Sequence, residues 1–225
     1  MHPVSGEVYL LDARTGVYQL EADGGTTHVW HGDAAQYGIQ LPSEYTDLAD
    51  LPDGTIAITA HSFGYLLDLE ADTFQQHFCY EPGFVDDPNL WLEERQITDS
   101  LTYNTVTGQL MAQPQTIDLN TTDVLRSEVA TFDVASGEDL AWTGIVGIAS
   151  LRAGAMVALD ADTVLLAAEA TLYSWSPQNG LRFDYDFLAN GISSVEGMAL
   201  DANAERLYVI DASTRELVVL AYKPQ

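Results

Sequence analysis

The chain repeats one pattern of short apolar segments and turns, and this repeat restricts the fold more than any other feature. The segment VYLLDARTGVYQL, Val8–Leu20, aligns with LYVIDASTRELVVL, Leu207–Leu220, when one residue is inserted. Similar segments begin near Ile56, Leu110 and Val164, so the successive steps are 48, 54, 54 and 43 residues. Repeats of roughly 40–50 residues with four strands each are typical of a β-propeller.

Each full unit contains four short runs of β-branched and aromatic residues separated by turn residues, a pattern that predicts strands. In the second unit the predicted strands are Thr46–Leu51, Thr55–Ala60, Tyr65–Leu69 and Phe74–Phe78. In the fourth unit they are Ala155–Leu159, Thr163–Ala168, Thr171–Trp175 and Leu181–Phe187. We therefore predict an all-β fold: one domain over residues 1–225, a β-propeller of about five four-stranded antiparallel blades. A β-sandwich is the alternative, but the matching first and last units favour the propeller.

The first and last units are shorter than the three between them. When Met1 is aligned with Leu200, the first unit begins at the turn that follows its innermost strand. The last unit stops at Gln225, before a fourth strand. We expect the first and last blades to be incomplete, with the missing strands supplied by a segment upstream of Met1 or by a partner chain.

The charge of the chain restricts its partners. It has 34 acidic residues against 8 basic ones and a formal net charge of −26. Such a field repels phosphate backbones and anionic membrane surfaces, so we expect neither nucleic acid nor membrane as a partner. An acidic excess with a single lysine, Lys223, also suits a salt-adapted organism, in which self-repulsion is screened.

The localisation stays open between two readings. No apolar stretch is long enough to cross a bilayer, and no signal peptide is visible at Met1. Cys79 is the only cysteine, so the sequence contains no internal disulfide. The protein is either cytoplasmic in a salt-adapted organism, or secreted or periplasmic with its signal removed.

Long connections predict where a binding surface would lie. They are His31–Tyr45, Tyr80–Ile97, Gly144–Ala153 and Gln113–Ser127. In a four-stranded meander these connections all emerge on one face, and insertions on one face of a repeat array commonly form its binding surface. We predict ligand contacts from its acidic, aromatic and histidine residues: His31, Asp33, Tyr37, Glu44, Tyr45, His61, Phe84, Asp86, Asp87 and Trp91. His31, Asp33 and His61 are also an alternative set of zinc ligands.

Three acidic residues stand at predicted inner-strand starts, where they would face the central channel. They are Asp47, Asp99 and Glu196. Converging carboxylates suit a hard cation such as calcium, which binds six to eight oxygen atoms. The competing interpretation is that these carboxylates only accept backbone hydrogen bonds in turns.

Two phrases of the chain resemble NHL-type and gluconolactonase/regucalcin-like propellers: DLADLPDGTIAIT, Asp47–Thr59, and SVEGMALDANAERLYVID, Ser194–Asp211. In the gluconolactonase-like family, residues at inner-strand starts hold a divalent metal and one acid serves as general base. The resemblance implies that Glu196 is a metal ligand, with Asp47 and Asp99 as weaker matches.

Three functions therefore remain open. The first is a binding module that presents an acidic, aromatic loop face to a partner protein, a carbohydrate or a cation. The second is a divalent-metal-dependent hydrolase of the lactonase or esterase type, with its carboxylate site at the channel. The third is a structural repeat within a larger chain. The G-x-S-x-G, H-E-x-x-H and C-x-x-C motifs of other enzyme classes do not occur.

Overall fold

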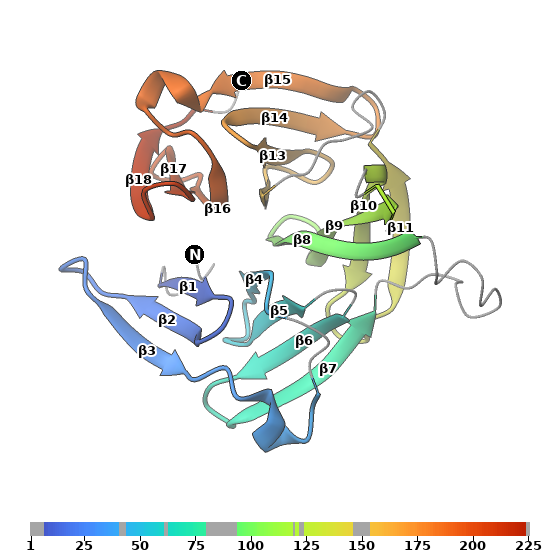
Figure 1. Ribbon diagram of the computed structural model, residues 1–225, viewed down its shortest axis with the longest axis vertical. Coiled ribbons are helices and arrows are strands. Elements are labelled where there is room, and N and C mark those ends of the chain that lie inside the picture. Colours follow the sequence, from blue (N-terminus) through green and yellow to red (C-terminus); the bar gives the residue numbers. More distant parts are fainter. Residues whose placement is uncertain are drawn as a thin grey trace.

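The computed structural model describes residues 7–40, 44–60, 63–79, 94–118, 120–121, 124–145 and 154–223, apart from the side chains of 79, 94–99, 117 and 118. These residues form five antiparallel sheets arranged in a ring (Figure 1). The predicted all-β propeller of five blades is thus confirmed. In the described residues, no helix is long and apolar enough to cross a membrane.

Blade 1 contains β1 (Val8–Asp12), β2 (Gly16–Leu20) and β3 (Thr26–Trp30). Blade 2 contains β4 (Asp47–Asp50), β5 (Ile56–Ala60), β6 (Phe63–Asp68) and β7 (Thr73–Cys79). Blade 3 contains β8 (Glu94–Asn104), β9 (Gln109–Asp118), β10 (Val124–Asp133) and β11 (Asp139–Gly144). Blade 4 contains β12 (Ala155–Ala158), β13 (Val164–Ala168), β14 (Thr171–Ser176) and β15 (Gly180–Asp186). Blade 5 contains β16 (Val195–Asp201), β17 (Arg206–Asp211) and β18 (Glu216–Ala221). Two short 3-10 helices, η1 (Ala34–Tyr37) and η4 (Phe187–Asn190), follow β3 and β15.

The first and last sheets have three strands, whereas the middle three have four, as predicted. The backbone N–H of Tyr45, just before β4, donates to the carbonyl of Ala13, just after β1, at 3.2 Å. Strand β1 therefore ends near the point where the inner strand β4 begins. The two strands run in opposite directions, so β1 has the direction of the second strand of a blade and not of the innermost one. In the described part of blade 1 the inner position has no strand, and in that of blade 5 the outer position has none.

One sequence interpretation was wrong. The segment 113–127 was expected to be a long connection between two strands. Instead, β9 and β10 continue through most of it as a paired ladder that reaches Ile117 opposite Val124. The reason is local pairing across the hairpin: the buried Gln113 side chain on β9 donates to Ser127 Oγ on β10 at 2.7 Å, so a polar residue that looks like part of a loop is bonded between two strands.

Apolar side chains from facing sheets fill the spaces between neighbouring blades. Tyr65 and Phe74 of blade 2 pack with Trp30 of blade 1. Phe78 of blade 2 stacks on Phe132 of blade 3, with ring centroids 5.0 Å apart. Separate clusters join blade 3 to blade 4 and blade 4 to blade 5. Within the described ranges, four seams between neighbouring blades hold a buried apolar cluster, and no such cluster joins blade 5 to blade 1.

Aspartates at strand ends account for part of the acidic composition. The carboxylate of Asp12 accepts the backbone N–H groups of Arg14 and Thr15 at 3.0 and 2.8 Å. Asp68, Asp133 and Asp160 make the same pair of bonds in their own turns. Many of the acids therefore order turns, as Asp side chains commonly do.

Gly154 lies where blade 4 approaches blade 5, and a Cβ at this position would collide with the backbone oxygen of Val195. We expect Gly154→Ala to lower the free energy of unfolding by about 1–3 kcal/mol, the usual cost of overpacking. Urea unfolding measures the change. Gly144→Ala is the control, because a Cβ there has no atom within 4 Å. Equal effects of the two substitutions would contradict a close approach of the blades.

The turn aspartates predict how stability depends on acid. The N–H groups of Ser136 and Ala135, with the Ser136 hydroxyl, hold the pKa of Asp133 below its usual value. A depressed pKa stabilises the fold above the unfolded value of about 3.9, and this stabilisation is lost as the pH falls further. Asparagine accepts the same bonds without a charge, so Asp133→Asn should lose less stability than the native protein between pH 5 and pH 2. Urea midpoints measure this, with the exposed Asp139→Asn as control. Parallel pH profiles for Asp133→Asn and the native chain would contradict the assignment.

Candidate functional site

The predicted metal ligands have different surroundings. Asp47 uses both carboxylate oxygens within the fold: Oδ1 accepts the N–H of Leu48 at 2.8 Å, and Oδ2 accepts the N–H of Leu101 at 2.7 Å. Asp47 thereby fastens β4 of blade 2 to β8 of blade 3. Glu196 is exposed at an irregularity in the pairing of β16. Asp99 lies within β8 at a similar irregularity, and its side chain is outside the described atoms.

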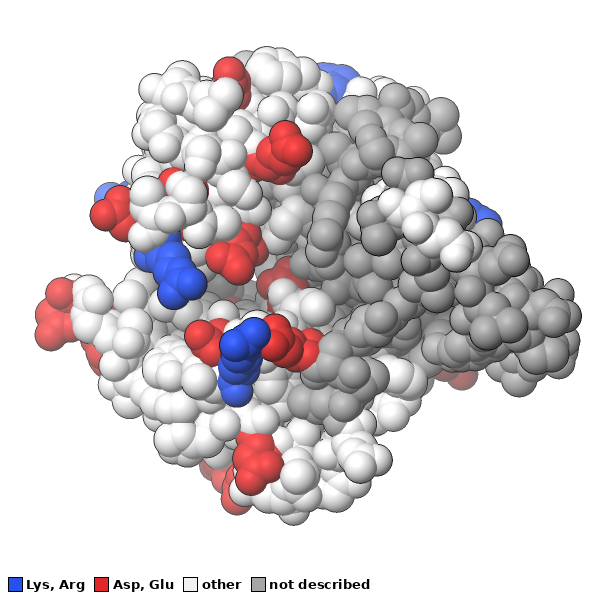
Figure 2. Space-filling model, viewed as in Figure 1, with Lys and Arg blue, Asp and Glu red and all other residues white. Residues whose placement is uncertain are grey.

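In the part of the chain that the structure describes, no group of three His, Cys, Asp or Glu residues could hold a metal ion. This range leaves out the Asp99 side chain, so the calcium site at the channel stays a prediction. Figure 2 shows one face of the ring, where Asp and Glu side chains lie around the middle.

The predicted loop residues that the structure describes are largely engaged within the fold. Tyr45 is 4% exposed, and its hydroxyl donates to the carbonyl of Gly32 at 2.8 Å. Tyr37 donates to Asp72 Oδ1 at 2.6 Å, and Glu44 pairs with Arg14 at 2.7 Å. His31 packs edge-on against His28, with ring centroids 4.0 Å apart.

No contact in the described residues tests the predicted ligand-binding role of the remaining loop residues. Asp33 stands before η1 and makes no side-chain capping bond there. His61, Phe84, Asp86, Asp87 and Trp91 lie outside the described residues.

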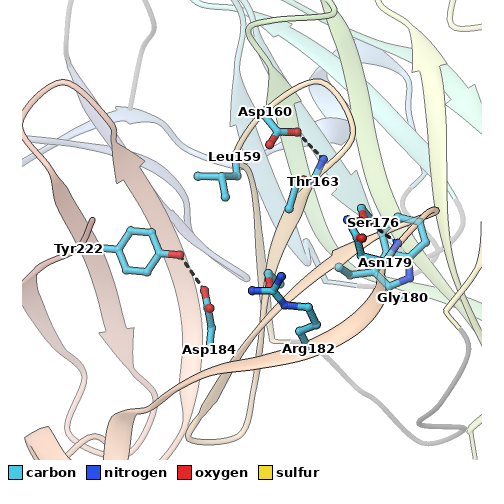
Figure 3. A pocket seen from close by; sticks show the side chains of 11 residues that line it. Leu159, Asp160, Thr163, Ser176, Asn179, Gly180, Arg182, Asp184 and Tyr222 are labelled. Carbon is cyan, nitrogen blue, oxygen red and sulfur yellow. Dashed lines mark hydrogen bonds between the residues drawn. The ribbon is translucent and has the colours of Figure 1, made fainter. Parts of the chain in front are cut away.

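A pocket of about 170 Å³ opens beside blade 4, on the side that faces blade 5 (Figure 3). Two turns of blade 4, 159–163 and 176–180, form one part of its wall. Strand β15 contributes Arg182 and Asp184, and Tyr222 reaches the pocket from the end of β18. None of the residues predicted from sequence lines it.

Hydrogen bonds fix most of the polar groups around the pocket. The Tyr222 hydroxyl donates to Asp184 Oδ2 at 2.8 Å, and the Tyr222 N–H donates to the Glu205 carbonyl at 2.8 Å. Ser176 Oγ accepts the Asn179 side-chain amide at 3.0 Å. Burial, followed by the bond to Asp184, raises the pKa of Tyr222, so its hydroxyl stays protonated at neutral pH.

Arg182 is the only basic residue of the pocket, and its guanidinium points toward the middle of it (Figure 3). Among the described residues it forms no ion pair. Two carboxylates, Asp160 and Asp184, share the pocket with this cation. Partial burial alone would raise the pKa of Asp160, but N–H groups of Asp162 and Thr163 outweigh it and lower that pKa. The pocket therefore contains a charged hydrogen-bond donor, the Arg182 guanidinium, and two charged acceptors, the carboxylates of Asp160 and Asp184.

Sequence reasoning missed this pocket because it joins distant segments. Asp184 and Tyr222 are 38 positions apart and meet only through the packing of blade 5 on blade 4. The one local signal is Arg182, a cation in a chain with 8 basic residues. It stands on a strand in which Arg182 and Asp184 alternate with exposed Phe183 and Tyr185.

Comparison with known proteins gives the fold and no closer relationship. No family model and no curated protein matches the chain. Similar solved structures include the extracellular domain of a candidate one-component system from B. thetaiotaomicron, at TM-score 0.53 and 12% identity, over 98% of this chain and 27% of that one. An auxiliary nutrient binding protein from Bacteroides thetaiotaomicron has TM-score 0.53 and 10% identity, over 94% of this chain and 65% of that one.

A gluconolactonase from Xanthomonas campestris has TM-score 0.55 and 10% identity, over 92% of this chain and 66% of that one. The chain thus spans less than two thirds of the length of each of these three structures. The resemblance to gluconolactonase-like propellers that the sequence suggested is present in the fold. At 10–12% identity these structures carry no residue-level information.

The two acidic positions that the structure describes should respond differently to truncation. Asp47→Ala removes two bonds from backbone N–H groups to a carboxylate, and we expect a loss of about 2 kcal/mol in unfolding free energy. Glu196→Ala removes an exposed side chain and should change stability by no more than about 0.5 kcal/mol. Guanidinium unfolding measures both. An Asp47→Ala protein as stable as the native one would show that Asp47 does not hold the two blades together.

Proposed function

We propose that this protein is a binding module, and that the pocket between blades 4 and 5 binds a neutral, hydroxyl-rich ligand such as one ring of a carbohydrate. The observation that carries the proposal is Arg182, an arginine without an ion-pair partner in the described residues, aimed into a pocket of hydroxyl, amide and carboxylate groups.

The charge balance of the pocket supports a neutral ligand. One guanidinium and the carboxylates of Asp160 and Asp184 leave a net negative charge, in a protein of charge −26, so an anionic ligand would be repelled. Sugar hydroxyl groups both donate and accept, so they can bond to carboxylate, guanidinium, Ser176 and Asn179 together. A volume of about 170 Å³ is below the ~300 Å³ of ordinary small-molecule sites, so it suits one ring of a longer molecule.

Loop contacts on the opposite end of the blades would extend the same function. The acidic, aromatic loop face predicted from sequence stays part of this proposal as a second surface, near Tyr37, Phe84 and Trp91. Either surface requires only binding groups held by a rigid scaffold, which is the usual arrangement of loops on a propeller.

The metal-dependent hydrolase is the weaker proposal. It requires three carboxylates to converge on an ion, whereas both oxygens of Asp47 accept backbone N–H groups. A calcium ion at this position would have to displace those bonds or share their oxygens. The similarity to a gluconolactonase, at 10% identity, supplies a fold and no catalytic residue.

Saccharide binding should raise the melting temperature. We expect at least one of glucose, galactose, mannose, xylose or maltose, at 100 mM and constant salt, to stabilise the protein. A ligand at 100 times its dissociation constant adds about 2.7 kcal/mol, which is roughly 5–10 °C for a chain of this size. Isothermal calorimetry then gives the affinity.

Two variants connect such binding to the pocket. Arg182→Ala and Tyr222→Phe should each weaken the affinity about tenfold, because each removes a hydrogen-bonding group from the wall. Arg126→Ala is the matched control, since Arg126 is an exposed arginine of β10 outside the pocket. Stabilisation that survives Arg182→Ala unchanged, or its absence with all five sugars, would refute the proposal.

A further inference from the structure

The turn between the first two strands of blade 3 carries an asparagine where blades 4 and 5 carry an aspartate. Asn104 ends β8, Asp160 follows β12 by two residues, and Asp201 ends β16. The three side chains have one contact in common, since the Oδ1 atom of each accepts backbone N–H groups of the turn that follows. An aspartate would satisfy the turn of blade 3 as well. The turn itself therefore gives no reason for an asparagine in so acidic a chain.

The amide nitrogen of Asn104 supplies that reason, because it donates to the neighbouring blade. Nδ2 donates to the backbone carbonyl of Asp160 at 2.7 Å and contacts Met111 Sδ at 3.5 Å. Oδ1 accepts the N–H groups of Val106 and Thr107 at 3.0 and 3.2 Å. The side chain is 1% exposed, so its polar atoms find their partners inside the protein. A carboxylate at this position could only accept hydrogen bonds, and it would repel the Asp160 carbonyl.

The bond from Asn104 reaches a turn that forms part of the pocket wall. Leu159, Asp160 and Thr163 line the pocket from this turn (Figure 3). Within the turn, Asp160 Oδ1 accepts the N–H groups of Asp162 and Thr163 at 2.9 and 2.8 Å. Asp160 is thus held from two sides: its carboxylate is bonded to its own turn, and its carbonyl is bonded to blade 3.

A second hydrogen bond holds the strand that leads into this turn. The N–H of Ala158, the last residue of β12, donates to Thr102 Oγ1 of β8 at 3.3 Å. Thr102 stands two positions before Asn104 on the same inner strand. Among the described residues, no hydrogen bond joins the Asp160 side chain to blade 5. Blade 3 therefore orders this wall of the pocket from behind, while the exposed Asp160 carboxylate is available to a ligand in the pocket.

We propose that Asn104 is a positioning residue for ligand binding in the pocket between blades 4 and 5. It touches no ligand itself, and it holds the turn 159–163 in the form that presents the Asp160 carboxylate to a hydroxyl group of the ligand. Blade 3 thereby takes part in a site to which it contributes no lining residue. The inference rests on the proposed function for the ligand, and on the hydrogen bonds of Asn104 for the order of the turn.

The first test uses the full chain and needs no ligand. Asn104→Ala removes every hydrogen bond of the side chain. Asn104→Ser keeps a hydroxyl group that can accept N–H groups of its own turn, but the side chain is too short to reach Asp160. Both variants should speed the amide exchange of Asp162 and Thr163 about fivefold or more, because the turn opens more often without the bond from blade 3. Hydrogen exchange followed by NMR measures the rates.

The Asp160 carboxylate gives a second readout without a ligand. Burial alone would raise the pKa of Asp160, but the N–H groups of Asp162 and Thr163 outweigh burial and lower that pKa. Replacing Asn104 loosens the turn, so the pKa of Asp160 should rise toward its ordinary value of about 3.9. Titration of the carboxyl group by NMR measures the change. A loss of global stability alone would not move the pKa of a group in the folded protein.

Ile58→Val is the control for lost stability. Ile58 is fully buried in the cluster between blades 1 and 2, so this substitution destabilises the fold without touching blades 3 to 5. It should leave the pKa of Asp160 unchanged and the exchange of Asp162 and Thr163 within about twofold of the native rate, since amides in turns exchange through local opening.

The second test uses the saccharide that most stabilises the native chain among the five sugars above. Asn104→Ser should weaken its affinity about fivefold to tenfold, whereas Ile58→Val should leave the affinity unchanged. Coupling between two sites is reciprocal, so the bound saccharide should slow the amide exchange of Val106 and Thr107 in blade 3, outside the pocket.

Two results would overturn the proposal. One is native exchange rates and a native pKa of Asp160 in both Asn104 variants, which would show that Asn104 does not order the turn. The other is a saccharide that binds Asn104→Ser as tightly as the native chain. If none of the five sugars binds, the proposed function fails, and the exchange and titration results still support or overturn the ordering of the pocket wall by Asn104.

Discussion

Burial of both faces of every sheet is the constraint on which this structure depends. A four-stranded meander with apolar residues on both faces cannot fold alone, because each face needs a partner. The ring satisfies that need by placing blades side by side, so that Trp30 and Phe74, or Phe78 and Phe132, fill one seam from two sheets. Close contacts such as that of Gly154 with Val195 exist only because the seams are narrow.

The same constraint explains why the unusual features gather at blade 5. Four seams of the described residues have an apolar cluster, and the fifth, between blades 5 and 1, has none. Blade 5 has no fourth strand in those residues to continue the wall opposite β15. The side of β15 that faces blade 5 carries Arg182 and Asp184 in place of the aromatic residues that fill the seam between blades 1 and 2. The polar pocket therefore lies beside the blade that has three strands in the described residues.

The acidic composition has more than one role. Part of it forms the turns, where Asp12, Asp68 and Asp133 accept backbone N–H groups, and part ties blades together, as Asp47 does between β4 and β8. The sequence pattern made Asp47 a candidate metal ligand, and its contacts are those of a structural residue. Backbone N–H groups in turns commonly require a hydrogen-bond acceptor, and a single carboxylate can supply it. A metal site requires several carboxylates at one point.

The sequence by itself determined the repeat, the number of blades and most strand positions, because alternating apolar residues and turn residues act over a few neighbours. Predicted Thr171–Trp175 became Thr171–Ser176, and predicted Thr55–Ala60 became Ile56–Ala60. It failed at Gln113–Ser127, where cross-strand bonds made a hairpin of polar residues. Only the tertiary structure decided which side chains meet. Tyr222 reaches Asp184, and Phe78 stacks on Phe132, because these contacts depend on how one blade packs against the next.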